Sequence, residues 1–148
     1  MNILTNQIQL LCEEPDLLAT LCNITAALNE HFDNINWVGF YFWKNNELVL
    51  GPFQGKVACT HIPYGKGVCG YCALTKETII VDNVHDFKGH IACDSSSLSE
   101  IVVPLIYNNQ LLGVIDIDAP ILNRFTLEDK KQLEEIAPII TKKIITYL

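Results

Sequence analysis

"EIVVPLIYNNQLLGVIDID", residues 100–118, is the stretch that decides the fold. Its two apolar runs are separated by an Asn-Asn dipeptide, which is typical of a tight turn between antiparallel strands. We therefore expect a β-hairpin with strands 100–107 and 110–118. Pro104 has no backbone N–H to donate, so it indicates a sheet edge or a bulge in the first strand.

The two faces of the expected strands carry different side chains, because successive residues point to opposite sides. One face of the hairpin is aliphatic, with Ile101, Val103, Leu105, Ile115 and Ile117, and the other carries Glu100, Asp116 and Asp118. An earlier strand, "NWVGFYFW" (36–43), has Val38, Phe40 and Phe42 on one side and Trp37, Gly39, Tyr41 and Trp43 on the other. The apolar side is suited to packing under helices.

Asp116 and Asp118 share one face and repel each other, an arrangement that is tolerated in water or beside a cation. One interpretation is a solvent-facing strand end. The other is a pocket for a small cationic group, rimmed by Trp37 and Tyr41.

The rest of the chain surrounds these strands. We expect helices over 4–32, interrupted near Glu14-Pro15, then a turn at "KNNE" and a strand at 48–51. A loop-rich region at 52–70, a short helix at 68–75, a strand at 77–81 and a long polar connection at 82–98 should follow. The last expected element is a helix from Thr126 to about 147, in which Pro138 allows a kink. Helices at both ends and hairpin strands between them predict an α+β fold with an antiparallel sheet.

Size and charge exclude several classes of protein. The 148 residues fit one domain, and a net charge of -7 with a pI near 4.9 argues against a nucleic-acid partner. No apolar run approaches the ~20 residues of a membrane span. The first residues contain no basic side chain before their apolar run, so we expect no secretory signal and a cytoplasmic protein.

Six cysteines, at positions 12, 22, 59, 69, 72 and 93, raise the question of redox or metal chemistry. Cys12 and Cys22 fit helical patterns and are best explained as packing residues. A zinc site at Cys69-x-x-Cys72 lacks a second ligand pair, and a thioredoxin-like motif lacks its βαβ unit. What remains is a reactive cysteine with one or two resolving partners.

Two of the loop cysteines have features that could favour a thiolate. A helix that begins near Cys69 would favour the charged form through its dipole. Cys93 has His90 three residues before it, and the imidazole could stabilise a thiolate if the loop folds back.

Five segments closely resemble the free methionine-(R)-sulfoxide reductase family, single-domain enzymes of the GAF fold. They are "NWVGFY", "GPFQGKVAC", "IPYGKGVCG", "VDNVHDFKGHIACDSSSLSEIVVPL" and "GVIDIDAP", about half the chain. The resemblance implies a single GAF domain over residues 1–148, with terminal helices on one face of the sheet and a ligand pocket on the other. Cys72 departs from the family pattern, and we expect it to pack as a small apolar side chain rather than act as an extra resolving thiol.

The resemblance also implies residue roles. Cys93 matches the catalytic cysteine, and Cys69 and Cys59 match cysteines that resolve or relay the disulfide, in an order that stays open. The residues that match the substrate pocket are Trp37, Tyr41, Glu100, Asp116 and Asp118.

The expected reaction is reduction of free L-methionine (R)-S-oxide, with Cys93 as nucleophile and a sulfenic acid as intermediate. Glu100, or Asp116 or Asp118 behind it, would donate the proton, and the remaining carboxylates would bind the substrate ammonium. Thioredoxin or another dithiol would be the reductant, with no bound cofactor or metal. Because GAF domains often pair through terminal helices, a homodimer is among the expected assemblies. The alternative is a non-catalytic GAF sensor, which the lack of an output domain or linker disfavours.

Overall fold

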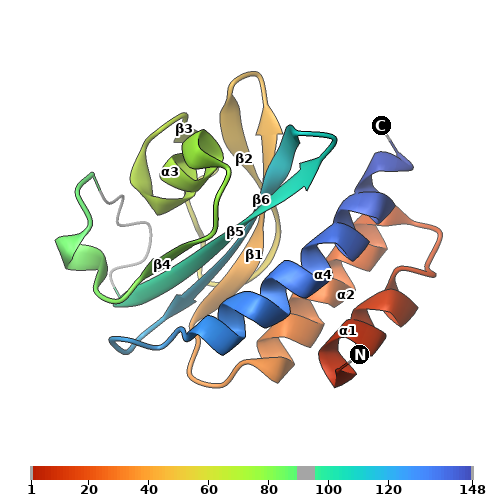
Figure 1. Cartoon of the computed structure of the whole chain (residues 1–148), viewed down its shortest axis with the longest axis horizontal. Helices are drawn as coiled ribbons and strands as arrows, with labels where there is room; N and C mark the ends of the chain where they lie inside the picture. Colours follow the sequence, from red (N-terminus) through yellow and green to blue (C-terminus); the bar gives the residue numbers. More distant parts are fainter. Residues whose placement is uncertain (1, 90–95, 148) are drawn as a thin grey trace.

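The structure, a computed structural model, describes residues 2–89 and 96–147. Within these residues the centre is a six-stranded antiparallel sheet in the order β3-β2-β1-β6-β5-β4 (Figure 1). The strands are β1 (Trp37–Lys44), β2 (Glu47–Gly55), β3 (His61–Pro63), β4 (Ile79–Val81), β5 (Ser99–Tyr107) and β6 (Gln110–Ala119). The expected α+β class with an antiparallel sheet is confirmed.

Helices cover the two faces of the sheet unequally. Three of them, α1 (Ile3–Leu11), α2 (Leu17–His31) and α4 (Leu127–Ile145), lie together on one face, and α3 (Gly67–Thr75) lies on the other (Figure 1). The three-helix face packs on the strand residues that the alternation predicted, Val38, Phe40, Ile101, Val103, Leu105, Ile115 and Ile117. None of the helices in the described chain is long and apolar enough to cross a membrane.

Asparagine pairs form the two tight hairpin turns. Asn108 and Asn109, between β5 and β6, have φ values of 50° and 63°, and Asn45 and Asn46, between β1 and β2, have 52° and 62°. Two successive residues with positive φ are the signature of the turn that best matches the twist of paired strands. Both turns that the sequence predicted are therefore confirmed.

Pro104 lies at a position of β5 where few strand-to-strand hydrogen bonds are lost. Strand β4 pairs only with residues 100–102 of β5, so Pro104 lies beyond its end, and the β5–β6 register shifts between Leu105 and Ile106. The expected edge or bulge is thus confirmed, since β5 becomes an edge at this point.

The loop-rich interpretation of residues 52–70 was partly wrong. Strand β2 continues to Gly55 because its residues 53–55 still pair with β1, and β3 adds three paired residues. The polar connection at 82–98 likewise contains a short 3₁₀ helix, η1 (Val84–Asp86), capped by the side chain of Asn83. Glycine, proline and polar residues obscured these elements, and the strand residues are recognised only through their pairing with β1 and β2.

The terminal helices follow their sequence signals. The break between α1 and α2 falls around Pro15, and Asp16 caps α2 by accepting from Ala19 N. Thr126 and Asp129 form the expected reciprocal capping box at the start of α4, which continues through Pro138.

Candidate functional site

Three carboxyl groups meet on the sheet face that α3 covers. Glu100 on β5 pairs directly with Asp118 on β6, and Asp116 pairs with Gly39 on β1 and Val102 on β5. Glu100 is 7% exposed and Asp116 5% exposed, and Asp118 is half-buried. The solvent-facing interpretation of these acids is therefore wrong.

Burial and mutual repulsion change how these acids titrate. The pKa of Glu100 is raised well above its usual value, first by burial and then by the negative charges of Asp116 and Asp118. Burial also raises the pKa of Asp116, against the opposing effect of hydrogen bonds with Glu100, Asp118 and Cys69. Burial and the neighbouring negative charges therefore favour the protonated form of Glu100 over the carboxylate.

The acid cluster is suited to a cation. Neither Glu100 nor Asp116 forms an ion pair with a basic side chain among the described residues. Asp116 Oδ1 is buried and has no hydrogen-bond partner there. A buried oxygen without a donor is costly, so a positively charged donor that entered this site would be bound favourably.

Cys69 places a thiol against the same cluster. It lies in the first turn of α3, is 4% exposed, and its Sγ donates to Glu100 Oε2 at 4.0 Å. The pKa of this thiol is raised well above its usual value, chiefly by burial and then by Asp116, Glu100 and Asp118. The expectation that the helix dipole makes Cys69 a thiolate is therefore wrong, because burial and three acidic neighbours outweigh the dipole.

Glycines let α3 come close to the rest of the site. A Cβ on Gly70 would lie 2.8 Å from the carbonyl oxygen of Pro63, the last residue of β3. Gly67, the first residue of the helix, has φ of 63°, which favours glycine. The close approach brings Cys69 down onto the sheet.

The structure describes Cys59 and Cys72 but not Cys93. Cys59 is half-buried and disulfide-bonded, and its carbonyl oxygen accepts from the Tyr41 hydroxyl at 2.9 Å. Cys93 and His90 lie outside the described residues, so the proposed nucleophile cannot be placed. Cys72 is fully buried, its Sγ lies 3.7 Å from the Val102 carbonyl, and burial raises its pKa to about 12. An inert packing role for Cys72 fits these surroundings.

Trp37 and Tyr41, which were expected at the rim of a pocket, are almost fully buried. Each is 2% exposed, and their rings stack at 5.9 Å on the same face as the acids. Their polar atoms are engaged, since Trp37 Nε1 donates to the carbonyl of Lys56 and the Tyr41 hydroxyl to that of Cys59. The two aromatics thus lie between the acid cluster and the loop that carries Cys59.

Phe53 is a residue of this region that the sequence did not reveal. Its ring stacks on Trp37 at 5.2 Å and 15°. Had the predicted strand been extended beyond residue 51, it would have revealed Phe53, because residues 53 and 55 pair with residues 39 and 37 of β1.

One group of described side chains could hold a metal ion. The ligand atoms of Cys69, Glu100 and Asp116 all lie within 4.8 Å of one another. This group does not correspond to the zinc hypothesis from sequence, because Cys72 points its sulfur at a backbone carbonyl instead. The same two acids also supply oxygens that can accept hydrogen bonds from an ammonium group.

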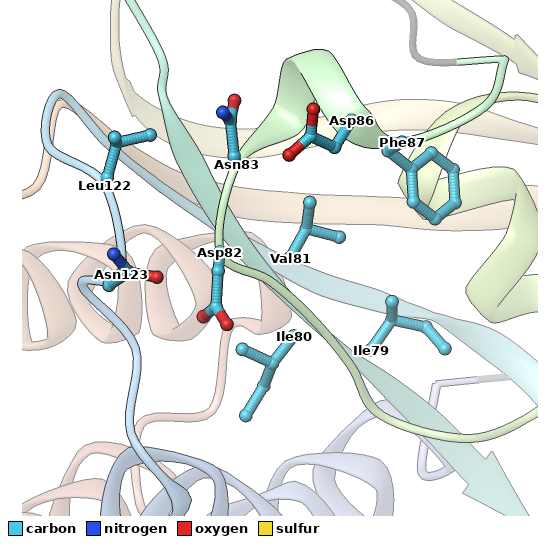
Figure 2. Close-up of a pocket in the computed structure, with 9 residues that line it drawn as sticks. All are labelled: Ile79, Ile80, Val81, Asp82, Asn83, Asp86, Phe87, Leu122 and Asn123. Carbon is cyan, nitrogen blue, oxygen red and sulfur yellow. The ribbon is translucent and has the colours of Figure 1, made fainter.

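A separate hollow lies at the free edge of β4. It has a volume of about 490 Å³ and contains none of the expected site residues. Figure 2 shows Asp82 beside Asn123, with Asp86 and Asn83 on the η1 side of the hollow. Its wide opening and exposed carboxylates make it a surface feature apart from the acid cluster.

Comparisons with known proteins identify the family to which the chain belongs. A family model described as the GAF domain matches residues 13–143. The free methionine-R-sulfoxide reductase of Escherichia coli is 47% identical over 93% of this chain and 83% of its own length. The reduced form of fRMsr of Staphylococcus aureus superposes with a TM-score of 0.91 at 54% identity, covering 95% of this chain and 92% of that one.

A substrate complex is also among the similar structures. The free methionine-R-sulfoxide reductase of Neisseria meningitidis, in complex with its substrate, has a TM-score of 0.90 at 43% identity over 95% of this chain and 85% of that one. These relatives match nearly the whole length of the chain. The chain therefore belongs to the GAF domain family and, within it, to the free methionine-R-sulfoxide reductases.

Proposed function

We propose that this protein reduces free L-methionine (R)-S-oxide to methionine. The observation that carries the proposal is the buried cluster of Glu100, Asp116 and Asp118 beside Cys69, in a chain closely related to enzymes named for this reaction. A free amino acid brings an ammonium group, and the cluster supplies the negative charge and the unpartnered oxygen that would bind it.

The first step transfers oxygen from substrate to enzyme. The Cys93 thiolate attacks the sulfoxide sulfur, the S–O bond breaks, and the oxygen ends on Cys93 as a sulfenic acid. The substrate sulfur gains two electrons, Cys93 loses two, and one proton is consumed. Cys93 has this role by its match to the family's GHIACD segment, since it lies outside the described residues.

Glu100 is the proposed proton donor. Its raised pKa favours the protonated form that a proton donor needs, and Asp116 and Asp118 would bind the ammonium. A general acid of this kind contributes about 10²–10⁴-fold to a rate. Trp37 and Tyr41 would form the apolar wall for the S-methyl end through their ring faces.

Cys59 is the better candidate for the resolving thiol. It is half-buried and disulfide-bonded, whereas Cys69 is buried and keeps a free thiol whose pKa is raised. In the second step the Cys59 thiol attacks the sulfenic sulfur, forming a disulfide and releasing water. Thioredoxin, or another dithiol, would then reduce that disulfide by thiol–disulfide exchange. Cys69 would act as a relay or as a wall of the site.

A single-turnover experiment tests the assignment. Reduced protein is mixed with free methionine (R)-S-oxide without reductant, and methionine and remaining thiols are counted. Wild type should release one methionine and lose two thiols per chain, and Cys93→Ser should release none. Cys59→Ser should also release one methionine. When thioredoxin or another dithiol is then added, Cys59→Ser should turn over slowly, while Cys69→Ser should turn over faster than Cys59→Ser. Methionine release by Cys93→Ser would contradict the nucleophile.

The same experiment separates the enzyme from a GAF sensor. A sensor would bind the sulfoxide with no change in thiol count and no methionine formed. That result in the wild-type protein would overturn the proposed function.

A further inference from the structure

We infer that Tyr41 and Trp37 are positioning residues that hold the loop carrying Cys59 in place for disulfide formation. The inference rests on the proposed function, since it concerns the step in which Cys59 captures the sulfenic acid. It assigns the polar atoms of the two aromatics a role separate from contact with substrate.

The loop needs an external hold because it has no regular structure of its own. Residues 56–60 belong to no helix or strand, Lys56 is exposed, and Val57 is 88% exposed. Only Ala58 and Cys59 are half-buried, against the apolar cluster under α3, so the segment has few contacts of its own and is easily displaced.

Three hydrogen bonds tie this loop to the sheet, and two come from the aromatic side chains. Trp37 Nε1 donates to the Lys56 carbonyl at 3.1 Å, and the Tyr41 hydroxyl donates to the Cys59 carbonyl at 2.9 Å. The third joins Leu50 N to the Thr60 carbonyl at 2.9 Å. The side-chain bonds therefore fix both ends of the four residues that lead to the Cys59 sulfur.

The indole that makes the first of these bonds is itself held rigidly. A Cβ on Gly39 would lie 2.8 Å from Trp37 Cη2, and one on Gly55 would lie 2.5 Å from Trp37 Cδ1, so the ring lies flat across two glycines. Phe53 stacks on it and Tyr41 lies on the same sheet face. Donors on a packed strand orient a loop more accurately than the loop could orient itself.

Tyr41→Phe is the sharpest variant, because it removes one hydroxyl and keeps the ring. Methionine release and disulfide formation are followed separately after a rapid mix of reduced protein with free methionine (R)-S-oxide, by acid quench and thiol alkylation. We expect disulfide formation to slow by about two- to tenfold more than methionine release does, as the loss of one hydrogen bond implies.

Tyr107→Phe is the matched control, since it makes the same chemical change on an exposed side chain at the far end of β5. It should leave both steps unchanged. Equal slowing of both steps by Tyr41→Phe would mean that the hydroxyl serves the substrate and would overturn the inference, as would an unchanged disulfide step.

A second readout does not depend on activity. The alkylation rate of Cys59 by iodoacetamide, measured by peptide mass spectrometry in the reduced protein, should rise about two- to tenfold in Tyr41→Phe and stay constant in Tyr107→Phe. If wild type releases no methionine, the proposed function fails, and alkylation alone decides the inference. Equal Cys59 alkylation in wild type and Tyr41→Phe would then overturn it.

Discussion

The two faces of one sheet have opposite chemical characters, although the same strands supply both. The face under α1, α2 and α4 is packed with aliphatic and Phe side chains. The face under α3 has its own apolar cluster, but it also buries Glu100 and Asp116, the two acids that are buried in the described chain. The first face contributes stability, whereas the second accepts the cost of two buried acids at the candidate site.

The difference follows from what each side chain does when it is buried. An aliphatic residue gains roughly 25 cal/mol for each Å² of apolar surface removed from water. A buried carboxyl group loses its hydration and is tolerated only if it keeps its proton or meets a cation. The raised pKa of Glu100 favours the first of these in the free protein, and the substrate ammonium would supply the second.

The largest expected effect is on the three-helix face. Leu133 is fully buried in α4, so Leu133→Ala should lower the free energy of unfolding by about 2–5 kcal/mol. Chemical denaturation measures this, with Leu127→Ala as control, because Leu127 in the same helix is 78% exposed and should change stability by less than about 0.5 kcal/mol. Activity per folded molecule should be retained. A loss of activity in the folded variant would contradict the idea that the three-helix face contributes to stability alone.

Glu100→Gln should lower activity and leave stability unharmed, the reverse of Leu133→Ala. The first-turnover rate should fall by ~10²-fold or more, because the proton donor is lost. Stability at neutral pH should be retained or raised, because an amide removes the cost of a buried acid. Exposed Glu77 provides the control variant Glu77→Gln. An unchanged rate would move the proton-donor role to Asp116 or Asp118.

The pH dependence of stability should show the same burial cost. The folded pKa of Glu100 is raised above its ordinary value of 4.5, so the unfolded chain loses this proton at lower pH than the folded one. Its contribution to stability is therefore fully present below about pH 4.5 and is lost as pH rises toward the folded pKa. Denaturant unfolding from pH 4.5 to 9 should show wild type losing stability relative to Glu100→Gln, and parallel curves would contradict the assignment.

The smallest expected effect belongs to Cys72, which lies in α3, beside the candidate site, and for which we expect no role in the reaction. Cys72→Ala removes a buried sulfur and should lower the free energy of unfolding by about 1 kcal/mol, with turnover unchanged. Wild type and variant should lose the same number of thiols per turnover. A variant that recycles more slowly would make Cys72 a resolving thiol after all.

Several features of the site were predictable residue by residue. The alternation in β1, β5 and β6 places Trp37, Tyr41, Glu100, Asp116 and Asp118 on one face, because a strand has a fixed period of two. The Asn pairs and the capping box also act over a few residues, so local chemistry sufficed to predict them. Cys69 was a different case, since the dipole argument considered its helix without the acids that face it from the sheet.

The sequence by itself determined the α+β class, the hairpins and the division of side chains between faces, since these depend on periodicity and on turn residues next to each other in the chain. Only the tertiary structure decided that the acids are buried, that Cys69 is held as a thiol, and that Trp37 and Tyr41 bond to the loop of Cys59. Burial and pKa depend on segments distant in sequence. Here α3 and the loop at 56–60 pack against one face of the sheet, and no local pattern encodes what they contact.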